Sequence, residues 1–385
     1  MIHNRFMLIA ALSILLASCQ KEIDRQNSSI SSSVLESNEK IGNEGMVYTL
    51  SNQVSENKVL AYSRDASGHL TFLKAYPTGE KGTGAGLGSQ EAVILSRNNE
   101  WLLAVNAGSN SVSSFKISRD NLQLISTVSS QGTTPISVTE HNNIVYVLNA
   151  GGSGNISGFT LDQSGNLKPI ANSVRPLSST SASPAQISFT TNGKAVVVTE
   201  KATNKIITYT INSDGIPGIM HSISSSTPIP FGFAVANNSY IYVSQAAGTP
   251  NASTVSSYYV KDDGSISLVD GSVGAGQTSA CWVVLTNNGK YIFTTNAGSG
   301  SISSFKTNHS GDIAVLNAVA AATGTNSSPI DAALSNNSKF LYVLTSGNQA
   351  ISAFTIGNDG SLGQVQVETG LPIGTSGLQL NKKYC

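Results

Sequence analysis

Short apolar runs alternate with polar stretches along most of the chain, and one arrangement of the two recurs. The run WLLAV precedes the phrase NAGSNSVSSF, which begins at Asn106, and the run YIFTT precedes NAGSGSISSF, which begins at Asn296. A looser copy, NAGGSGNISGF, begins at Asn149. We find seven such units, the first of them degenerate, spaced roughly 43 to 54 residues apart. Repeats of this length predict a fold assembled from identical small units of several strands each.

Each unit divides into four short segments with the pattern of β-strands. A first segment such as SPAQISF or SPIDAAL precedes a turn such as TNNGK, and a run rich in Val, Ile, Tyr and Phe follows. After the NAGS loop, SVSSF or SISSF alternates small with apolar residues, and a DG or DxxG turn leads to a fourth strand. The pattern predicts an all-β fold, a seven-bladed β-propeller with four-stranded antiparallel blades. An eight-bladed ring is the alternative, although we find no eighth copy.

The two ends of the repeat region predict how the ring closes. The first unit lacks its first strand, because Met46 starts directly on the second-strand pattern. The chain ends with LPIGTSGLQL, which has the pattern of a first strand without successors. We therefore expect the C-terminal strand to join the N-terminal blade, which removes exposed sheet edges.

The N-terminal segment does not follow the repeat. Residues 1–18 combine a short basic region with a short apolar run, the pattern of a secretory signal peptide. LASC, which ends at Cys19, resembles the bacterial lipobox, and an ordinary signal peptide is the alternative. The lipobox resemblance implies lipidation of Cys19 and an outer-membrane lipoprotein of the cell envelope, periplasmic or surface-exposed. Residues 19–44 are polar and aperiodic and predict a flexible tether, which leaves residues 45–385 for the propeller.

Composition excludes several classes of function. Lysine plus arginine and aspartate plus glutamate both number 22, so no net positive field favours nucleic acid. Cys281 and Cys385 do not form a closely spaced pair, so neither a disulfide framework nor a zinc site is indicated. We expect no cofactor, no metal, membrane contact through the lipid anchor only, and a monomer with a small sugar-like ligand.

Blade geometry sorts the polar residues between two faces. In a propeller, the loops before the first strand and after the second strand open on one face around the channel. The candidate residues of that face come from two registers: Ser137, Gln186, Gly232, Trp282 and Asp331 in the first strands, and Asn106, Asn149, Glu200, Gln245, Asn296 and Thr345 after the second strands. Glu91 is a further candidate, since we expect SQEAV to be a first strand. The histidines of the repeat region lie in turns of the opposite face or on an outer strand, which disfavours a Ser-His-Asp site and a His-rich metal site.

Two carboxylates stand out in this set and predict catalytic roles. Glu200 interrupts the Asn pattern of its register, and Asp331 places a charge where its equivalents are neutral. Charged groups near a propeller channel are costly unless they are paired or functional. Lys201 is a charge partner at the site, or it pairs with Glu200 in solvent.

Ligand-binding roles follow for several uncharged residues of the same face. We expect Gln186 and Gln245 to orient a ligand and Phe231, which flanks Gly232, to contribute to its binding. Trp282 either stacks on a sugar ring or serves packing only. Asn149 and Asn296 either bind the ligand or cap a turn.

Several segments resemble the seven-bladed lactonase family, whose best-known members are the propeller-type 6-phosphogluconolactonases. They are VVVTEKATNKIITYTINSDG, YIFTTNAGSGSISSFKTNHSGDI, SPAQISFTTNGK and SPIDAALSNNSKFLYV. The resemblance implies hydrolytic opening of a sugar lactone by an activated water, which needs a general base and a group that stabilises the oxyanion. The chain departs from the phosphogluconolactonases where a histidine follows the first-strand proline, since Ile136, Ala185 and Ile330 stand there. None of the arginines Arg64, Arg97, Arg119 and Arg175 belongs to the candidate set.

Two functions therefore stay open. The first is a lactonase-like hydrolase of the cell envelope that opens a sugar-type lactone or a similar small ester, with Glu200 as the base. The second is a non-catalytic propeller that binds a ligand or a protein partner on its channel face.

Overall fold

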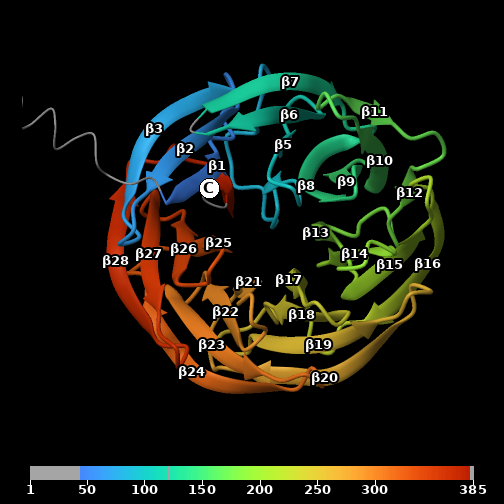
Figure 1. Cartoon of the computed structure of the whole chain (residues 1–385). Coiled ribbons are helices and arrows are strands. Elements are labelled where there is room, and N and C mark those ends of the chain that lie inside the picture. Colours follow the sequence, from blue (N-terminus) through green and yellow to red (C-terminus); the bar gives the residue numbers. More distant parts are fainter. Residues whose placement is uncertain (1–43, 120, 382–385) are drawn as a thin grey trace, which may run out of the picture. The chain divides into compact units, whose positions relative to one another are not determined.

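Seven antiparallel sheets surround a central channel in the computed structural model, which describes residues 44–119 and 121–381 (Figure 1). The prediction of a seven-bladed β-propeller is confirmed, because six sheets have four strands and one has a short fifth strand. None of these residues forms a helix long and apolar enough to cross a membrane. The predicted signal peptide, the lipidation site at Cys19 and the tether up to residue 43 lie outside the described residues.

The first three blades are given from the innermost strand outward. Blade 1 contains β29 (Ser376–Leu380), β1 (Gly45–Leu50), β2 (Lys58–Arg64) and β3 (Leu70–Pro77). Blade 2 contains β4 (Val93–Leu95), β5 (Trp101–Asn106), β6 (Ser111–Ser118) and β7 (Asn121–Ser129). Blade 3 contains β8 (Thr133–His141), β9 (Ile144–Gly151), β10 (Asn155–Leu161), β11 (Leu167–Pro169) and β12 (Arg175–Pro176).

The other four blades follow the same order. Blade 4 contains β13 (Pro184–Phe189), β14 (Ala195–Glu200), β15 (Lys205–Ile211) and β16 (Pro217–Ser224). Blade 5 contains β17 (Pro230–Val235), β18 (Tyr240–Gln245), β19 (Thr254–Val260) and β20 (Ile266–Gly274). Blade 6 contains β21 (Ala280–Leu285), β22 (Tyr291–Asn296), β23 (Ser301–Thr307) and β24 (Ile313–Ala322). Blade 7 contains β25 (Pro329–Leu334), β26 (Phe340–Thr345), β27 (Ala350–Ile356) and β28 (Leu362–Thr369).

The hydrophobic core lies between neighbouring blades. Between blades 4 and 5, Val197 and Ile206 pack with Phe233, Val243 and Tyr258. Second strands such as β14 are buried along their whole length, because both faces of each blade contact a neighbour. This explains why the second-strand runs are continuously apolar rather than alternating.

The DG and DxxG turns join each blade to the one before it. Gly165 has φ +86°, and a Cβ atom there would lie 2.2 Å from the ring of Trp101 in the preceding blade. Gly68 has φ +90°, and its Cβ would lie 2.4 Å from Phe340. Glycine is required at these turns by the left-handed backbone and by the neighbouring ring together.

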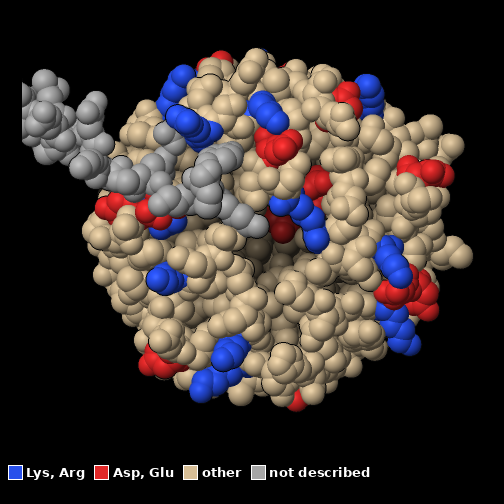
Figure 2. Space-filling view, in the orientation of Figure 1, with Lys and Arg blue, Asp and Glu red and all other residues tan. Residues whose placement is uncertain are grey.

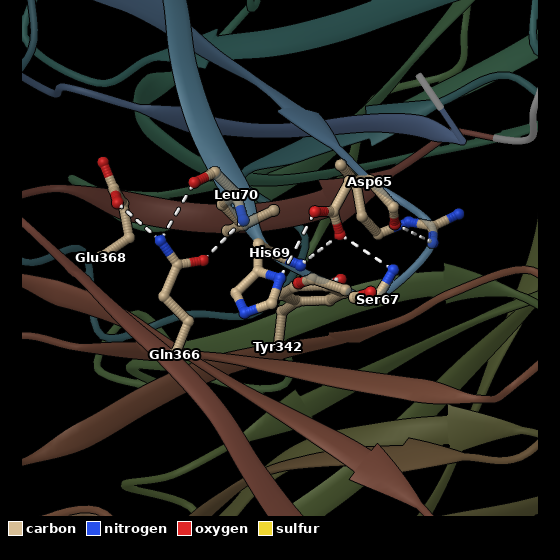
Figure 3. Close-up of polar contacts among 9 residues, drawn as sticks. Asp65, Ser67, His69, Leu70, Tyr342, Gln366 and Glu368 are labelled. Atoms are coloured by element: carbon tan, nitrogen blue, oxygen red, sulfur yellow. Dashed lines mark hydrogen bonds and ion pairs between the residues drawn. The ribbon is translucent and has the colours of Figure 1, made fainter. Parts of the chain in front are cut away.

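The ring closes as predicted from the ends of the repeat region. Strand β29 pairs with β1, with Val47 opposite Leu380. Figure 3 shows the adjoining contact between blades 7 and 1, where the Gln366 side chain accepts a hydrogen bond from Leu70 N at 2.6 Å and donates one to Leu70 O at 3.0 Å. Tyr342 also donates to Gly68 O across this contact. Side chains of blade 7 thus form hydrogen bonds with backbone groups of blade 1 where the last blade meets the first.

Residues 87–91, which we call the plug, lie between β3 of blade 1 and β4 of blade 2 and cross the channel (Figure 1). We expected SQEAV to be a first strand, but β4 begins only at Val93. Glu91 has φ +64°, and the Gln90 side chain bonds both backbone groups of Val283 in blade 6, which is not a neighbour of blade 2. Gly232 makes room for this crossing, since a Cβ there would lie 2.2 Å from Gln90 Oε1.

Candidate functional site

A cavity of about 300 Å³ occupies the channel on one side of the plug. We call it the channel cavity; its polar lining consists of Gln90, Glu91, Ser188, Asn287, Asp331 and Gln379. Its walls include Val235, Leu285 and Leu334, which end innermost strands. The cavity therefore lies toward the turns that follow the first strands, opposite the face on which we expected the site.

Two carboxyl groups from distant blades meet at this cavity. Asp331 in β25 is only 2% exposed, and its Oδ1 accepts a hydrogen bond from Ala332 N at 2.8 Å. Its Oδ2 is buried and has no hydrogen-bond partner. Glu91 in the plug accepts a long hydrogen bond of 3.5 Å from Ser188 Oγ at Oε1, while its buried Oε2 also lacks a partner. Unpartnered buried oxygens are rare and costly, so both carboxyl groups retain capacity to bind a ligand, a proton or water.

The surroundings keep these carboxyl groups protonated at higher pH than usual. Burial raises the pKa of Glu91 to about 8, against the lowering effect of hydrogen bonds from Gln186 and Ser188. Burial also raises the pKa of Asp331 well above its usual range, and the nearby Glu91 carboxylate raises it further. Two coupled carboxyl groups of this kind hold a proton near neutral pH, which is the condition for one to act as acid and the other as base.

A smaller hollow of about 150 Å³ extends the site toward blade 3 and shares Glu91, Ser188 and Gln379 with the channel cavity. Arg97 and Glu140 line it, and Glu140 accepts hydrogen bonds from Arg97 N and Asn143 N. Figure 2 shows acidic atoms deep in the central hollow and basic side chains at its rim. Arg97, which we left out of the candidate set, thus lines a hollow together with Glu91.

Three predicted residues meet on the opposite side of the plug. The rings of Phe231 and Trp282 lie 4.7 Å apart, and Trp282 Nε1 donates to Ser89 O at 2.8 Å. Lys201 Nζ lies 4.8 Å from the Phe231 ring centroid and donates to Gly88 O at 2.8 Å. Burial lowers the pKa of Lys201 to about 8. These residues hold the plug in place, and none of them lines the channel cavity.

Glu200 lies apart from both groups, at the end of β14. It is fully buried, and its carboxylate accepts hydrogen bonds from Ser178 N at 2.8 Å, from Ser178 Oγ, and from Thr203 Oγ1 at 2.6 Å. No ion pair joins it to Lys201 in the described part of the chain. Glu200 therefore anchors the segment after β12 to blade 4 and does not share a pocket with Asp331.

Gln186 is a predicted uncharged residue that contacts one member of the carboxyl pair, Glu91. Its side chain bonds N and O of Phe233 in blade 5 and also bonds Glu91. Gln245, in contrast, is enclosed in blade 5 and accepts hydrogen bonds from Thr254 and Ser256. Gln186 thus positions Glu91, while Gln245 is part of the blade interior.

The recurring asparagines hold the strands of their own blades together. Asn296 Nδ2 donates to Ser301 at 3.1 Å and to Ser303 at 2.9 Å, and Asn106 makes the same pair of bonds to Ser111 and Ser113. Asn149 Nδ2 donates to Ser130 O, Asn155 and Ser157. In the repeated NAGSxSxSSF phrase, the asparagine side-chain amide therefore donates hydrogen bonds to two serines of the next strand.

Comparison with protein families matches residues 41–180 and 221–332 to the family described as Lactonase, 7-bladed beta-propeller. The chain belongs to the seven-bladed β-propeller lactonase family. A search of curated protein sequences finds no match.

Solved structures show the same fold at low sequence identity. A candidate 6-phosphogluconolactonase from Bacteroides uniformis is 19% identical with a TM-score of 0.69, over 88% of this chain and 100% of its own. A second one, from Bacteroides fragilis, is 17% identical with a TM-score of 0.69, over 88% and 99%. The periplasmic gluconolactonase of Pseudomonas aeruginosa is 16% identical with a TM-score of 0.67, over 86% and 98%. At these identities the likeness concerns the fold.

The channel cavity of this lactonase-family propeller lies on the opposite side of the plug from the face on which we expected the site. The missing information was the path of residues 87–91, which follows from long-range hydrogen bonds rather than from the repeat. One sequence feature points to the pairing of the two carboxylates: Glu91 and Asp331 each precede a short apolar segment, AVIL and AAL respectively. Within residues 44–119 and 121–381, no group of three or more His, Cys, Asp or Glu side chains is arranged to hold a metal ion.

Proposed function

We propose that the protein is a lactonase-like hydrolase that opens a sugar-type lactone in the channel cavity, with Glu91 and Asp331 as its acid–base pair. The observation that carries this proposal is the meeting of two raised-pKa carboxyl groups, each with an unpartnered oxygen, at one cavity. Family membership supports the class of reaction. Glu200 is not part of the proposal, because its carboxylate is already occupied by fold contacts.

The pair can supply both the general base and the group that stabilises the oxyanion. The ionised member takes a proton from a water molecule, whose oxygen bonds to the lactone carbonyl carbon. The protonated member donates a hydrogen bond to the carbonyl oxygen, where negative charge develops. The ring C–O bond then breaks, the released alkoxide oxygen takes a proton, and the product is the open hydroxy acid. Asp331 and Glu91 lie in a site partly closed to bulk water, which strengthens these interactions.

The proposal extends to the place of action. The lipobox-like sequence at Cys19 supports an exported lipoprotein of the cell envelope. Phosphorylated sugars are metabolites of the cytosol, so gluconolactones without a phosphate are the first substrates to test for an exported protein.

The test is hydrolysis of a panel of γ- and δ-lactones of sugars, followed by titration of the released acid with the spontaneous rate subtracted. We expect turnover by the wild type and a fall in kcat of about 100-fold or more in Glu91→Gln and in Asp331→Asn. Glu100→Gln, which changes an exposed carboxylate paired with Lys116 outside the channel cavity, is the matched control and should keep turnover. Equal rates for the wild type and both carboxyl variants would overturn the assignment. Ligand binding without turnover would favour the non-catalytic propeller instead.

A further inference from the structure

A larger groove runs outward from the channel cavity between blades 5 and 6. Its volume is about 740 Å³, and it shares Val235, Leu285 and Asn287 with the channel cavity. A cavity of about 300 Å³ is at the lower end of the range for small-ligand sites, whereas the groove falls well inside that range. The two spaces together accept a ligand longer than a single sugar ring.

The groove has the surface chemistry of a polysaccharide site. Its lining comes from the turns around Asn237, Asn288 and Asn308, with Tyr242 and Tyr291 beneath them. Asn287 Nδ2 is fixed to Asn336 O in blade 7, so its amide is held at the junction with the channel cavity. Asn237 is exposed and forms no hydrogen bond with the described part of the chain. Amide and phenol groups on ordered turns suit a ligand rich in hydroxyl groups.

The ionisable side chains that line the groove are basic, whereas those that line the channel cavity are acidic. Lys290, Lys306 and His309 line it, and no aspartate or glutamate does. Neither lysine belongs to an ion pair within residues 44–119 and 121–381. Figure 2 shows basic side chains gathered over β22 and β23. By contrast Lys194, which holds the same place in the corresponding turn of blade 4, is paired with Asp262 at 2.5 Å.

We propose that the groove between blades 5 and 6 binds an anionic oligosaccharide, such as one built from uronic acids, whose reactive end enters the channel cavity. Carboxylates along the saccharide meet Lys290 and Lys306, while its hydroxyl groups meet the asparagine turns. The part of the inference that concerns the reactive end rests on the proposed function. Binding in the groove does not require turnover and can be tested without it.

The experiment is isothermal titration calorimetry with a hexamer of α-1,4-linked galacturonic acid, and with cellohexaose as the neutral probe of equal length. We expect the acidic hexamer to bind more tightly than cellohexaose and to lose affinity as salt is raised. The double variant Lys290→Glu with Lys306→Glu should weaken binding about 10-fold or more. Lys194→Glu should leave binding unchanged. Equal affinity for both hexamers, or no loss in the double variant, would overturn the proposal.

The two proposals fail in different ways. Glu91→Gln should abolish hydrolysis of a monosaccharide lactone and retain binding of the acidic hexamer. The double lysine variant should retain hydrolysis of the monosaccharide lactone and lose the hexamer. Hexamer binding without any lactone turnover would refute the hydrolase and leave the groove as assigned, whereas turnover without hexamer binding would refute the groove alone.

Discussion

Glu200 and Asp331 are both enclosed by the fold, at 0% and 2% exposure, yet their surroundings differ. The Glu200 carboxylate accepts hydrogen bonds from one backbone amide and two hydroxyl groups, while Asp331 Oδ2 has no partner and faces a cavity. Both residues broke the pattern of their register in the sequence. The comparison teaches that a buried carboxylate whose oxygens are satisfied supports the fold, whereas one left unsatisfied at a cavity is available for chemistry.

The largest expected effect is the pH dependence of stability at the channel carboxyl pair. The folded-state pKa of Glu91 is about 8, above its ordinary value of 4.5, so the folded state binds more protons between these values. The contribution of Glu91 to stability is therefore complete below pH 4.5 and is lost as pH rises through about 8. The full difference corresponds to ~5 kcal/mol, and solvent access to the half-buried side chain reduces it.

Urea unfolding of the wild type and Glu91→Gln between pH 4 and pH 9 measures this effect. We expect the variant to match the wild type at pH 4 and to be more stable at pH 9. A constant difference over the whole range would show that Glu91 is not held in its neutral form.

The next effect concerns Glu200 and separates the two carboxylate sites. Replacing Glu200 by alanine leaves Ser178 N and two hydroxyl groups without their acceptor, so the free energy of unfolding should fall by about 3 kcal/mol at pH 7. Asp331→Asn should leave that free energy unchanged or raise it, since it replaces a buried carboxyl group whose ionisation is unfavourable. Chemical denaturation followed by tryptophan fluorescence tests both. If Asp331→Asn destabilises the protein more than Glu200→Ala does, the distinction between a structural Glu200 and an available Asp331 is wrong.

The smallest effect distinguishes two copies of the repeated phrase. Asn106 Oδ1 accepts a hydrogen bond from Asn57, whereas Asn296 Oδ1 is buried without a partner. Alanine at Asn106 should therefore cost about 2 kcal/mol of unfolding free energy and alanine at Asn296 about 1 kcal/mol. Thermal unfolding of the two variants side by side measures the difference, and an equal loss in both would argue against a role for Asn57.

Much of the fold could be predicted because its determinants are local. The alternation of small and apolar residues sets the strands, and the turn glycines at Gly68 and Gly165 mark where one blade meets the next. Asn106 and Asn296 bond to serines five and seven residues later, so they too belong to the repeat. The candidate site was predicted only in part: Asp331 was recognised as an exceptional carboxylate and Glu91 as a further candidate of the same face, but their pairing and their cavity were not predicted.

The sequence by itself determined the seven blades, the order of their strands and the closure of the ring by residues 376–380, because each depends on periodicity and turn chemistry within a few residues. Only the tertiary structure decided which carboxylates meet. Residues 87–91 cross the channel to contact blades 4 and 6, and hydrogen bonds between residues nearly two hundred positions apart hold them there. No local pattern encodes such contacts, since they depend on the space that the completed ring leaves at its centre.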